Sequence, residues 1–143
     1  MIIKKDFEYR PHEGELEKAT NAYIMSLVAV MVALPFPVIN LIATFFFYLG
    51  HKKSTHFVRW HTTQALLSQF SLFLMNIFAF RWTLLIVFGD SVATNLYISY
   101  MITVLLFNLT EFIATIYTAV KIRKGQHLEW YFYGPLTNTI VKS

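Results

Sequence analysis

The stretch VATNLYISYMITVLLFNLTEFIATIYTAV, residues 92–120, contains a single charged side chain, Glu111. It exceeds the roughly 20 apolar residues that a helix needs to cross a bilayer. Basic side chains and a glycine follow it directly: Lys121, Arg123, Lys124 and Gly125. Such an ending is typical of a helix that leaves the membrane. The stretch therefore predicts a transmembrane helix over about residues 92–120.

Another apolar stretch, residues 22–50, would form a helix of about 43 Å, longer than the roughly 30 Å hydrocarbon core. Pro35-Phe36-Pro37 interrupts it, and two prolines so close together favour a break in the helix. We expect two helices, over about residues 15–34 and 38–48, folded back as a hairpin. A single kinked span is the alternative.

We expect a further helix over about residues 55–80. Its first turns mix Arg59 and His61 with Phe57 and Trp60, which is typical of the membrane interface. Residues 81–91 contain Gly89 and Asp90 and are expected to connect it to the last helix.

The composition supports a membrane protein. Of 143 residues 56% are hydrophobic, including 14 Phe, 8 Tyr and 3 Trp, and the mean hydropathy is +0.50. A soluble domain of this size could not bury so much apolar surface. The predicted fold is an all-α bundle of four transmembrane helices within residues 15–124, with three helices as the alternative. A polar cytoplasmic segment, residues 1–14, precedes it, and an aromatic interfacial tail, residues 125–143, follows.

The net charge of +4 comes from basic residues at the ends of the apolar runs. That placement argues against a nucleic-acid-binding face and predicts which ends are cytoplasmic. The basic ends are Lys52-Lys53 and residues 121–124, whereas residues 81–91 carry only Arg81 against Asp90. Four crossings would place both termini in the cytoplasm, and three would place the N-terminus outside. The mixed charges of residues 1–20 do not resemble a signal peptide.

Polar side chains line one face of each of the last two predicted helices. In the final helix Glu111 lies at a depth where an ionised carboxylate is costly. Asn108, Thr115 and Thr118 share its face by helical spacing. The preceding helix has a matching stripe: His61, Gln64, Ser68 and Ser71. We expect the two faces to meet, either as a hydrophilic or proton-responsive site or as hydrogen bonds that hold the bundle together.

We expect neither enzymatic chemistry nor a cofactor. His51, His56 and His61 recur every five residues, a spacing that does not place two metal ligands on one helix face. The sequence has no cysteine and no recognisable nucleophile turn. Metal, cofactor and catalytic sites are therefore not predicted.

The C-terminal tail is rich in aromatic residues, with Trp130, Tyr131, Phe132 and Tyr133 in succession. Such side chains prefer the headgroup region, so we expect the tail to lie along the cytoplasmic leaflet. Together with Arg59 and Trp60 it would form an interfacial surface, or alternatively a docking surface for a partner protein.

Several of these segments resemble a known family. They are Lys52-Lys53, then Phe57-Val58-Arg59-Trp60-His61 with Gln64-Ala65-Leu66, and the two C-terminal elements Lys121 to Gly125 and Tyr133 to Pro135. The pattern, over about residues 18–141, is similar to the small bacterial four-helix membrane proteins related to the twenty-kilodalton channel component of the chloroplast inner-envelope import translocon. Leu67 and Glu111 depart from it. The resemblance implies a four-helix bundle in the bacterial inner membrane and a part in moving or assembling proteins.

The first functional hypothesis is therefore a non-enzymatic membrane subunit of a larger protein-translocation or membrane-assembly complex. Its partners would be the lipid bilayer and the other proteins of that complex. The alternative is a small autonomous or proton-coupled transporter in which Glu111 titrates.

Overall fold

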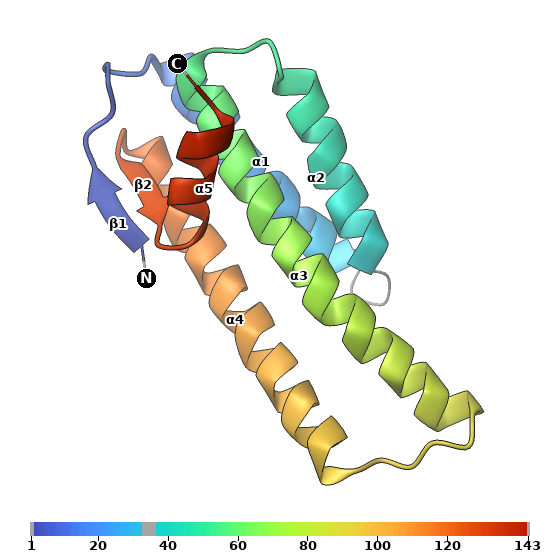
Figure 1. Ribbon diagram of the computed structural model, residues 1–143. Coiled ribbons are helices and arrows are strands. Elements are labelled where there is room, and N and C mark those ends of the chain that lie inside the picture. Colours follow the sequence, from blue (N-terminus) through green and yellow to red (C-terminus); the bar gives the residue numbers. More distant parts are fainter. Residues whose placement is uncertain (1, 33–36, 143) are drawn as a thin grey trace.

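The computed structural model describes residues 2–32 and 37–142. Within these residues the chain is mostly helical, with one small antiparallel sheet (Figure 1). The elements in chain order are β1 (Ile2–Lys5), α1 (Glu13–Val32), α2 (Pro37–His51), α3 (His56–Phe88), α4 (Asn95–Arg123), β2 (His127–Trp130) and α5 (Tyr133–Ile140). The two-stranded sheet is the part that the all-α expectation missed.

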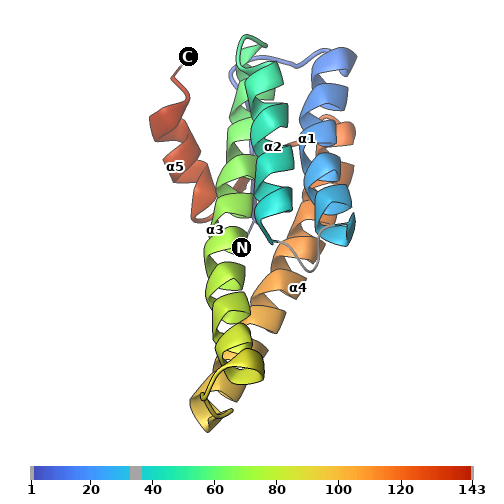
Figure 2. The ribbon, with the colours of Figure 1, turned by 90° about the vertical axis from the view of Figure 1, so that its right-hand side faces the viewer.

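The first four helices form an antiparallel bundle of unequal lengths. In both views α1 and α2 end about halfway along α3 and α4, which continue beyond them as a pair (Figures 1 and 2). In this far half α3 and α4 are joined by hydrogen bonds between Asn76 and Asn108 and between the hydroxyls of Thr83 and Tyr97. The molecule thus has a thick end with all its other elements and a thin end of two helices.

The helix bounds in the structure differ most from the expected ones at α3. Helix α1 ends at Val32 and α2 begins at Pro37, and residues 33–36 lie outside the described part of the chain. Helix α3 continues to Phe88 instead of ending near residue 80, because residues 81–88 contain neither glycine nor proline. Arg81 therefore lies within the helix, and the connector to α4 is only residues 89–94.

Two of the described helices, α3 and α4, are long and apolar enough to cross a membrane. Most of each apolar stretch is exposed, which distinguishes these helices from the core of a soluble protein. Phe88 is 83% exposed, for example, and Leu96 is 70% exposed. With its 15 residues α2 is about 22 Å long, short of the roughly 30 Å hydrocarbon core. The structure supports two candidate spans and does not establish the four that we expected.

The C-terminal segment packs against the bundle. Strand β2 pairs antiparallel with β1, with Ile2 opposite Trp130 and Lys5 opposite His127, and α5 packs on α3. We call β1 and residues 127–142, which include β2 and α5, the cap. Leu128, Trp130 and Tyr133 of the tail are buried, so these side chains pack inside the protein.

Candidate functional site

Buried polar side chains gather where the cap meets the bundle, and they form two clusters. The histidine network consists of Lys5, Tyr23, His61, Gln64, His127 and Glu129. The Glu111 cluster consists of Ser68, Glu111 and Tyr133. Both clusters use side chains of α3 together with side chains of the cap.

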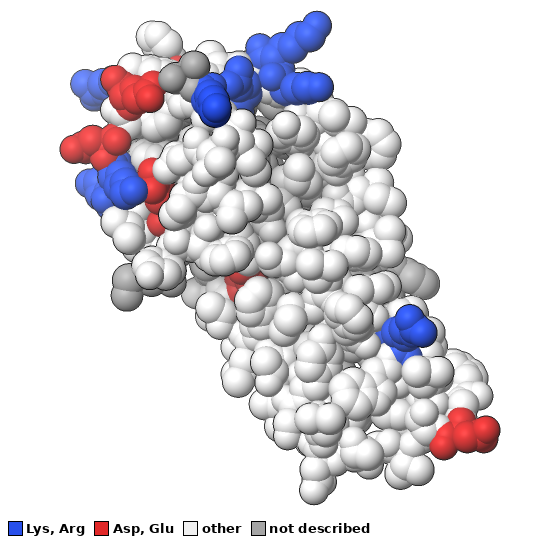
Figure 3. Space-filling model, in the orientation of Figure 1, with Lys and Arg blue, Asp and Glu red and all other residues white. Residues whose placement is uncertain are grey.

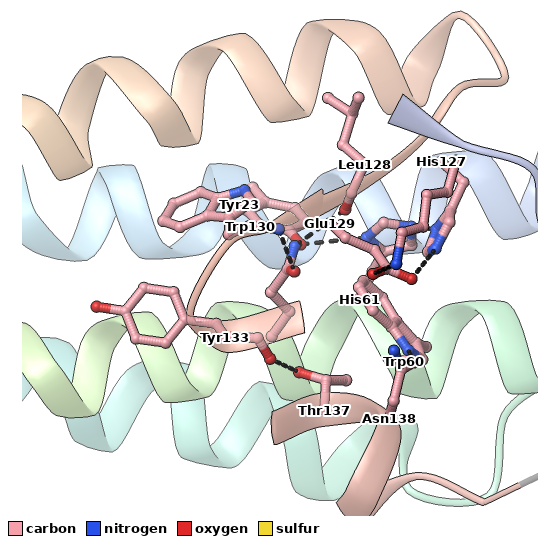
Figure 4. A network of polar contacts seen from close by, with 12 residues as sticks. Tyr23, Trp60, His61, His127, Leu128, Glu129, Trp130, Tyr133, Thr137 and Asn138 are labelled. Atoms are coloured by element: carbon pink, nitrogen blue, oxygen red, sulfur yellow. Dashed lines mark hydrogen bonds and ion pairs between the residues drawn. The ribbon is translucent and has the colours of Figure 1, made fainter. Parts of the chain in front are cut away.

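The histidine network is a continuous series of polar contacts (Figure 4). Gln64 Nε2 lies 2.8 Å from the Tyr23 hydroxyl, which lies 3.1 Å from His61 Nδ1. His61 Nε2 lies 3.0 Å from Nδ1 of His127. Nε2 of His127 lies 3.5 Å from Glu129 Oε1, and Glu129 Oε2 accepts a bond from Lys5 Nζ at 2.5 Å. The series thus leads from a fully buried amide to the half-exposed Lys5.

The chemistry of these groups fixes the direction of each hydrogen bond. The Tyr23 hydroxyl accepts from the Gln64 amide, so its own hydrogen must donate to His61 Nδ1 to be satisfied. Neutral His61 then carries its hydrogen on Nε2 and donates to His127 Nδ1. His127 in turn carries its hydrogen on Nε2, which faces Glu129. With both rings neutral, every hydrogen points towards the Glu129 carboxylate.

The electrostatics of the cap agree with this assignment. Burial lowers the pKa of His127, an effect that the nearby Glu129 carboxylate only partly opposes. Burial would raise the pKa of Glu129, but the hydrogen bond and charge of Lys5 hold it below its ordinary value. Neutral His127 and ionised Glu129 are therefore the favoured states.

Gln64 also attaches β2 to α3. Its Oε1 accepts from the backbone N–H of Trp130 at 3.0 Å, and its Nε2 lies 3.2 Å from the Leu128 carbonyl oxygen. The Trp130 indole N–H donates to Thr118 Oγ1 on α4 at 2.8 Å. The structure thus brings together Gln64, Thr118 and Trp130, which the sequence placed in two separate sites.

In the second cluster Glu111 is 6% exposed and has two hydroxyl donors. Ser68 Oγ donates to Oε2 at 2.6 Å, and the Tyr133 hydroxyl donates to Oε1 at 2.8 Å. The expected meeting of the two polar faces occurs at Ser68 and Glu111. Thr115 bonds instead to the Glu111 carbonyl of its own helix. The role of Tyr133 as a partner of Glu111 had no signal in the helical spacing.

Asn108 lies deeper along the same face of α4 and pairs with Asn76 of α3. Each side-chain amide donates to the other's oxygen, at 3.0 and 2.9 Å. The pair satisfies both amides at a depth where water is scarce.

Two cavities adjoin the Glu111 cluster. One, of about 560 Å³, lies between α3, α4 and the α1–α2 pair. The other, of about 520 Å³, lies between α3, α4 and the cap. Glu111 lines both cavities, and its carboxylate accepts hydrogen bonds from Ser68 and Tyr133.

The residues expected at the membrane interface mostly hold the cap in place. Trp60 is buried and donates from its indole N–H to Asn138 Oδ1 at 2.7 Å. Arg59 donates to the Lys142 carbonyl at 2.9 Å. Among the aromatic residues we singled out, Tyr131 and Phe132 are exposed, at 71% and 66%. The arrangement is therefore one of mutual hydrogen bonding, and no group of three or more His, Asp or Glu among the described residues is placed to hold a metal ion.

Comparison with known proteins gives one family. A family model described as the magnetosome magnetite crystal formation protein family (MamF/MmsF) matches residues 17–140. No curated protein and no solved structure gives a significant match. The matched range includes all of α2, α3, α4, β2 and α5, and both polar clusters apart from Lys5.

This match corrects two expectations from the sequence. The resemblance to the chloroplast translocon-related family is wrong. The function that we drew from it, protein translocation or membrane assembly, is also wrong, and so is the alternative of a small autonomous or proton-coupled transporter. The residues that carried the resemblance have structural roles. Arg59, Trp60 and Gln64 hold the cap by hydrogen bonds, so they indicate how the chain folds and not what it transports.

Proposed function

Because this chain belongs to the magnetosome magnetite crystal formation protein family, we propose that it takes part in magnetite crystal formation as a non-enzymatic protein of the magnetosome membrane. The observation that carries the proposal is the family match over residues 17–140, which includes both helices that are apolar enough to cross a membrane. A non-enzymatic role fits the clusters, whose polar atoms bond to one another and not to an open substrate site.

We further propose that α3 and α4 cross the membrane with the cap in the cytoplasm. The charges support this orientation, because most basic side chains on the face shown lie at the thick end of the molecule, whereas its middle shows only a small acidic patch (Figure 3). The positive ends Lys52-Lys53 and Lys121 to Lys124 would be cytoplasmic. The connector of residues 89–94 would then face the interior of the magnetosome.

In this arrangement α1 and α2 enter the bilayer from the cytoplasmic side and end within it. Their shorter reach in Figures 1 and 2 supports this placement. Their outward side chains are apolar, with Met31 69% exposed and Phe46 65% exposed. The arrangement that we propose therefore has two crossings, where the sequence led us to expect four, with three as the alternative.

The same arrangement favours a scaffolding role over direct contact with mineral. The interior connector offers one carboxylate, Asp90, whereas the cytoplasmic end carries the whole cap. The exposed Tyr131 and Phe132 of the cap, and the basic ends beside it, offer a surface for other magnetosome proteins.

The test is deletion of the gene in its own organism, with electron microscopy of the magnetite crystals. We expect the deletion strain to form crystals of altered size or number, and we expect the wild-type gene to restore them. Fractionation should recover the protein with purified magnetosomes. Normal crystals in the deletion strain, or a protein absent from magnetosomes, would overturn the proposal.

A further inference from the structure

The cap forms one wall of the cavity of about 520 Å³ that Glu111 lines. Ile2 of β1, Trp130 of β2 and Tyr133 of α5 line it from the cap, and Ser71 of α3 lines it from the bundle. Glu111 is 6% exposed, and the Tyr133 hydroxyl donates to its carboxylate at 2.8 Å. The cap therefore covers Glu111, and a movement of the cap away from the bundle would uncover it.

One contact between the cap and α3 joins two histidine rings. Nε2 of His61 on α3 lies 3.0 Å from Nδ1 of His127 (Figure 4). His127 is the first residue of β2 and comes two residues after Gly125, where the chain turns out of α4. The two rings thus meet beside the point at which the cap joins the bundle.

The contact between the rings has room for a single hydrogen. A protonated imidazole carries a hydrogen on both nitrogens, so no rotation of a protonated His127 ring offers His61 an acceptor. If His61 moved its own hydrogen to Nδ1, the hydroxyl hydrogen of Tyr23 would lose the acceptor that it has there. Tyr23 is 1% exposed. In either case a buried donor is left without an acceptor, which is costly.

The surroundings of His127 keep it neutral while the cap is closed. Its ring is 5% exposed, and burial lowers its pKa. The titratable groups that face it are Lys5 on β1, His56 and His61 on α3, and Glu129 on β2. Glu129 favours protonation, whereas Lys5 and His56 oppose it. In an open cap water would surround the ring and its pKa would return towards 6.5, so acid favours the open cap below about that pH.

We propose that the cap is a lid over Glu111 that opens when the histidine network takes up a proton. Opening separates β2 from α3, so the two rings no longer face each other and a protonated His127 can donate to water. It also moves Tyr133 away from Glu111, because Tyr133 directly follows the β2 segment in the chain. This inference is independent of the role in crystal formation, because it rests on the contacts of the cap.

The test uses the full-length protein in lipid nanodiscs with single introduced cysteines, since the sequence has none of its own. Thr137 is fully buried on α5, so Thr137→Cys should react with a soluble maleimide only when the cap opens. Thr139→Cys, exposed on the same helix, corrects for the pH dependence of the thiol reaction. From about pH 7.5 to about pH 5.5 the ratio of the two labelling rates should rise about tenfold, as for one histidine that titrates at 6.5 in the open state.

Two variants show which residue and which movement cause the rise. His127→Gln can still bond to His61 and Glu129 but takes up no proton, so it should reduce the rise at least threefold. The matched control His12→Gln, an exposed histidine outside the network, should retain the full rise. Ser26→Cys, buried on α1 within the bundle, should stay unlabelled at both pH values, which distinguishes opening of the cap from unfolding.

A membrane-soluble carbodiimide, which reacts with carboxylic acids, tests whether Glu111 is uncovered. At about pH 5.5 it should modify Glu111 at least threefold faster in the wild type than in His127→Gln, with the modified peptide identified by mass spectrometry. Labelling of wild-type Thr137→Cys that does not rise in acid would overturn the proposal, whether or not His127→Gln folds. So would an equal rise in folded His127→Gln, labelling of Ser26→Cys together with Thr137→Cys, or equal modification of Glu111 in the two proteins.

Discussion

At the scale of single residues, Glu111 is the only acidic residue of α3 and α4, and its two hydroxyl partners determine what it contributes. In Glu111→Gln the side chain can accept from one hydroxyl and donate to the other, so the loss should be about 1 kcal/mol or less. In Glu111→Leu the hydroxyls of Ser68 and Tyr133 lose their acceptor, and the protein should lose about 2 kcal/mol or more.

These losses can be measured as differences in unfolding free energy in mixed detergent micelles, with circular dichroism to monitor the unfolding. Thr103→Val is the control, because Thr103 is exposed on α4 and bonds only to its own helix, so its unfolding should match the wild type. Equal destabilisation by Gln and Leu would show that the ionised carboxylate itself is needed.

His127 makes the stability of the cap depend on pH. Burial holds its pKa below the ordinary value of 6.5, so the unfolded chain takes up the proton first as the pH falls. Stability due to His127 should therefore be fully present above about pH 6.5 and decrease as the pH falls below it. Protonated His127 would also turn an N–H towards the N–H of His61, which breaks the histidine network.

Hydrogen exchange of the β1 and β2 amides against pH would measure this effect. His127→Gln can still accept from His61 and donate to Glu129, so it should remove the part of the slope near pH 6 that is due to His127 and leave the part due to the buried, neutral His61. The pKa of Glu129 lies below its ordinary value of 4.5, so its contribution should be lost only at more acidic pH. A slope near pH 6 that is unchanged in His127→Gln would contradict the assignment.

At the scale of elements, the turn from α4 into β2 places the cap. Gly125 has φ of +80°, its N–H donates to the Ile122 carbonyl, and the N–H of Gln126 donates to the Lys121 carbonyl. This is a Schellman ending, in which a left-handed residue closes the helix. Gly125→Ala should cost about 1 kcal/mol, because a Cβ is strained in this conformation.

Thermal unfolding of the purified variant would measure this cost. Gly50→Ala is a matched control, because Gly50 lies inside α2 and a Cβ there would meet nothing within 4 Å. It should be neutral or slightly stabilising, since alanine favours a helix more than glycine does. If both variants lost the same stability, the turn would not be the cause.

The sequence could predict features that depend on neighbouring residues, but not contacts between distant segments. Helical spacing is local, so it identified the facing positions of Ser68 and Glu111. The pairing of Ile2 with Trp130 joins the two ends of the chain, and no local pattern encodes it. For the same reason Tyr133 was expected at the membrane surface, although its hydroxyl bonds to Glu111 inside the protein.

The error in function has a related cause. The segment from Phe57 to Leu66 is distinctive because its side chains meet the cap, as Trp60 does at Asn138 and Gln64 does at Trp130. A motif that maintains a fold can recur in proteins with different functions. A likeness in this segment therefore could not identify the family to which the chain belongs.

At the scale of the whole molecule, the unequal ends predict a labelling pattern in intact magnetosomes, whose outer face is cytoplasmic. The sequence has no cysteine, so each introduced cysteine reports one site. A membrane-impermeant maleimide should label Lys53→Cys and Lys142→Cys from outside. It should label Asp90→Cys only after detergent opens the membrane, because the connector faces the interior in the orientation that we propose.

Met31→Cys distinguishes two crossings from four. Met31 is exposed near the end of α1 and lines the cavity of about 560 Å³. Helix α1 ends about halfway along α3 and α4 (Figure 1). If α1 and α2 end within the bilayer, this cysteine lies in hydrocarbon, where its thiol does not ionise. A maleimide reacts with the thiolate, so the cysteine should stay unlabelled even in vesicles that are loaded with the reagent. If α1 and α2 crossed completely, Met31→Cys would lie at the interior surface and would be labelled there together with Asp90→Cys. Labelling of both from the interior would therefore restore the four-helix topology and refute the two-span arrangement, whereas labelling of Asp90→Cys alone would support it.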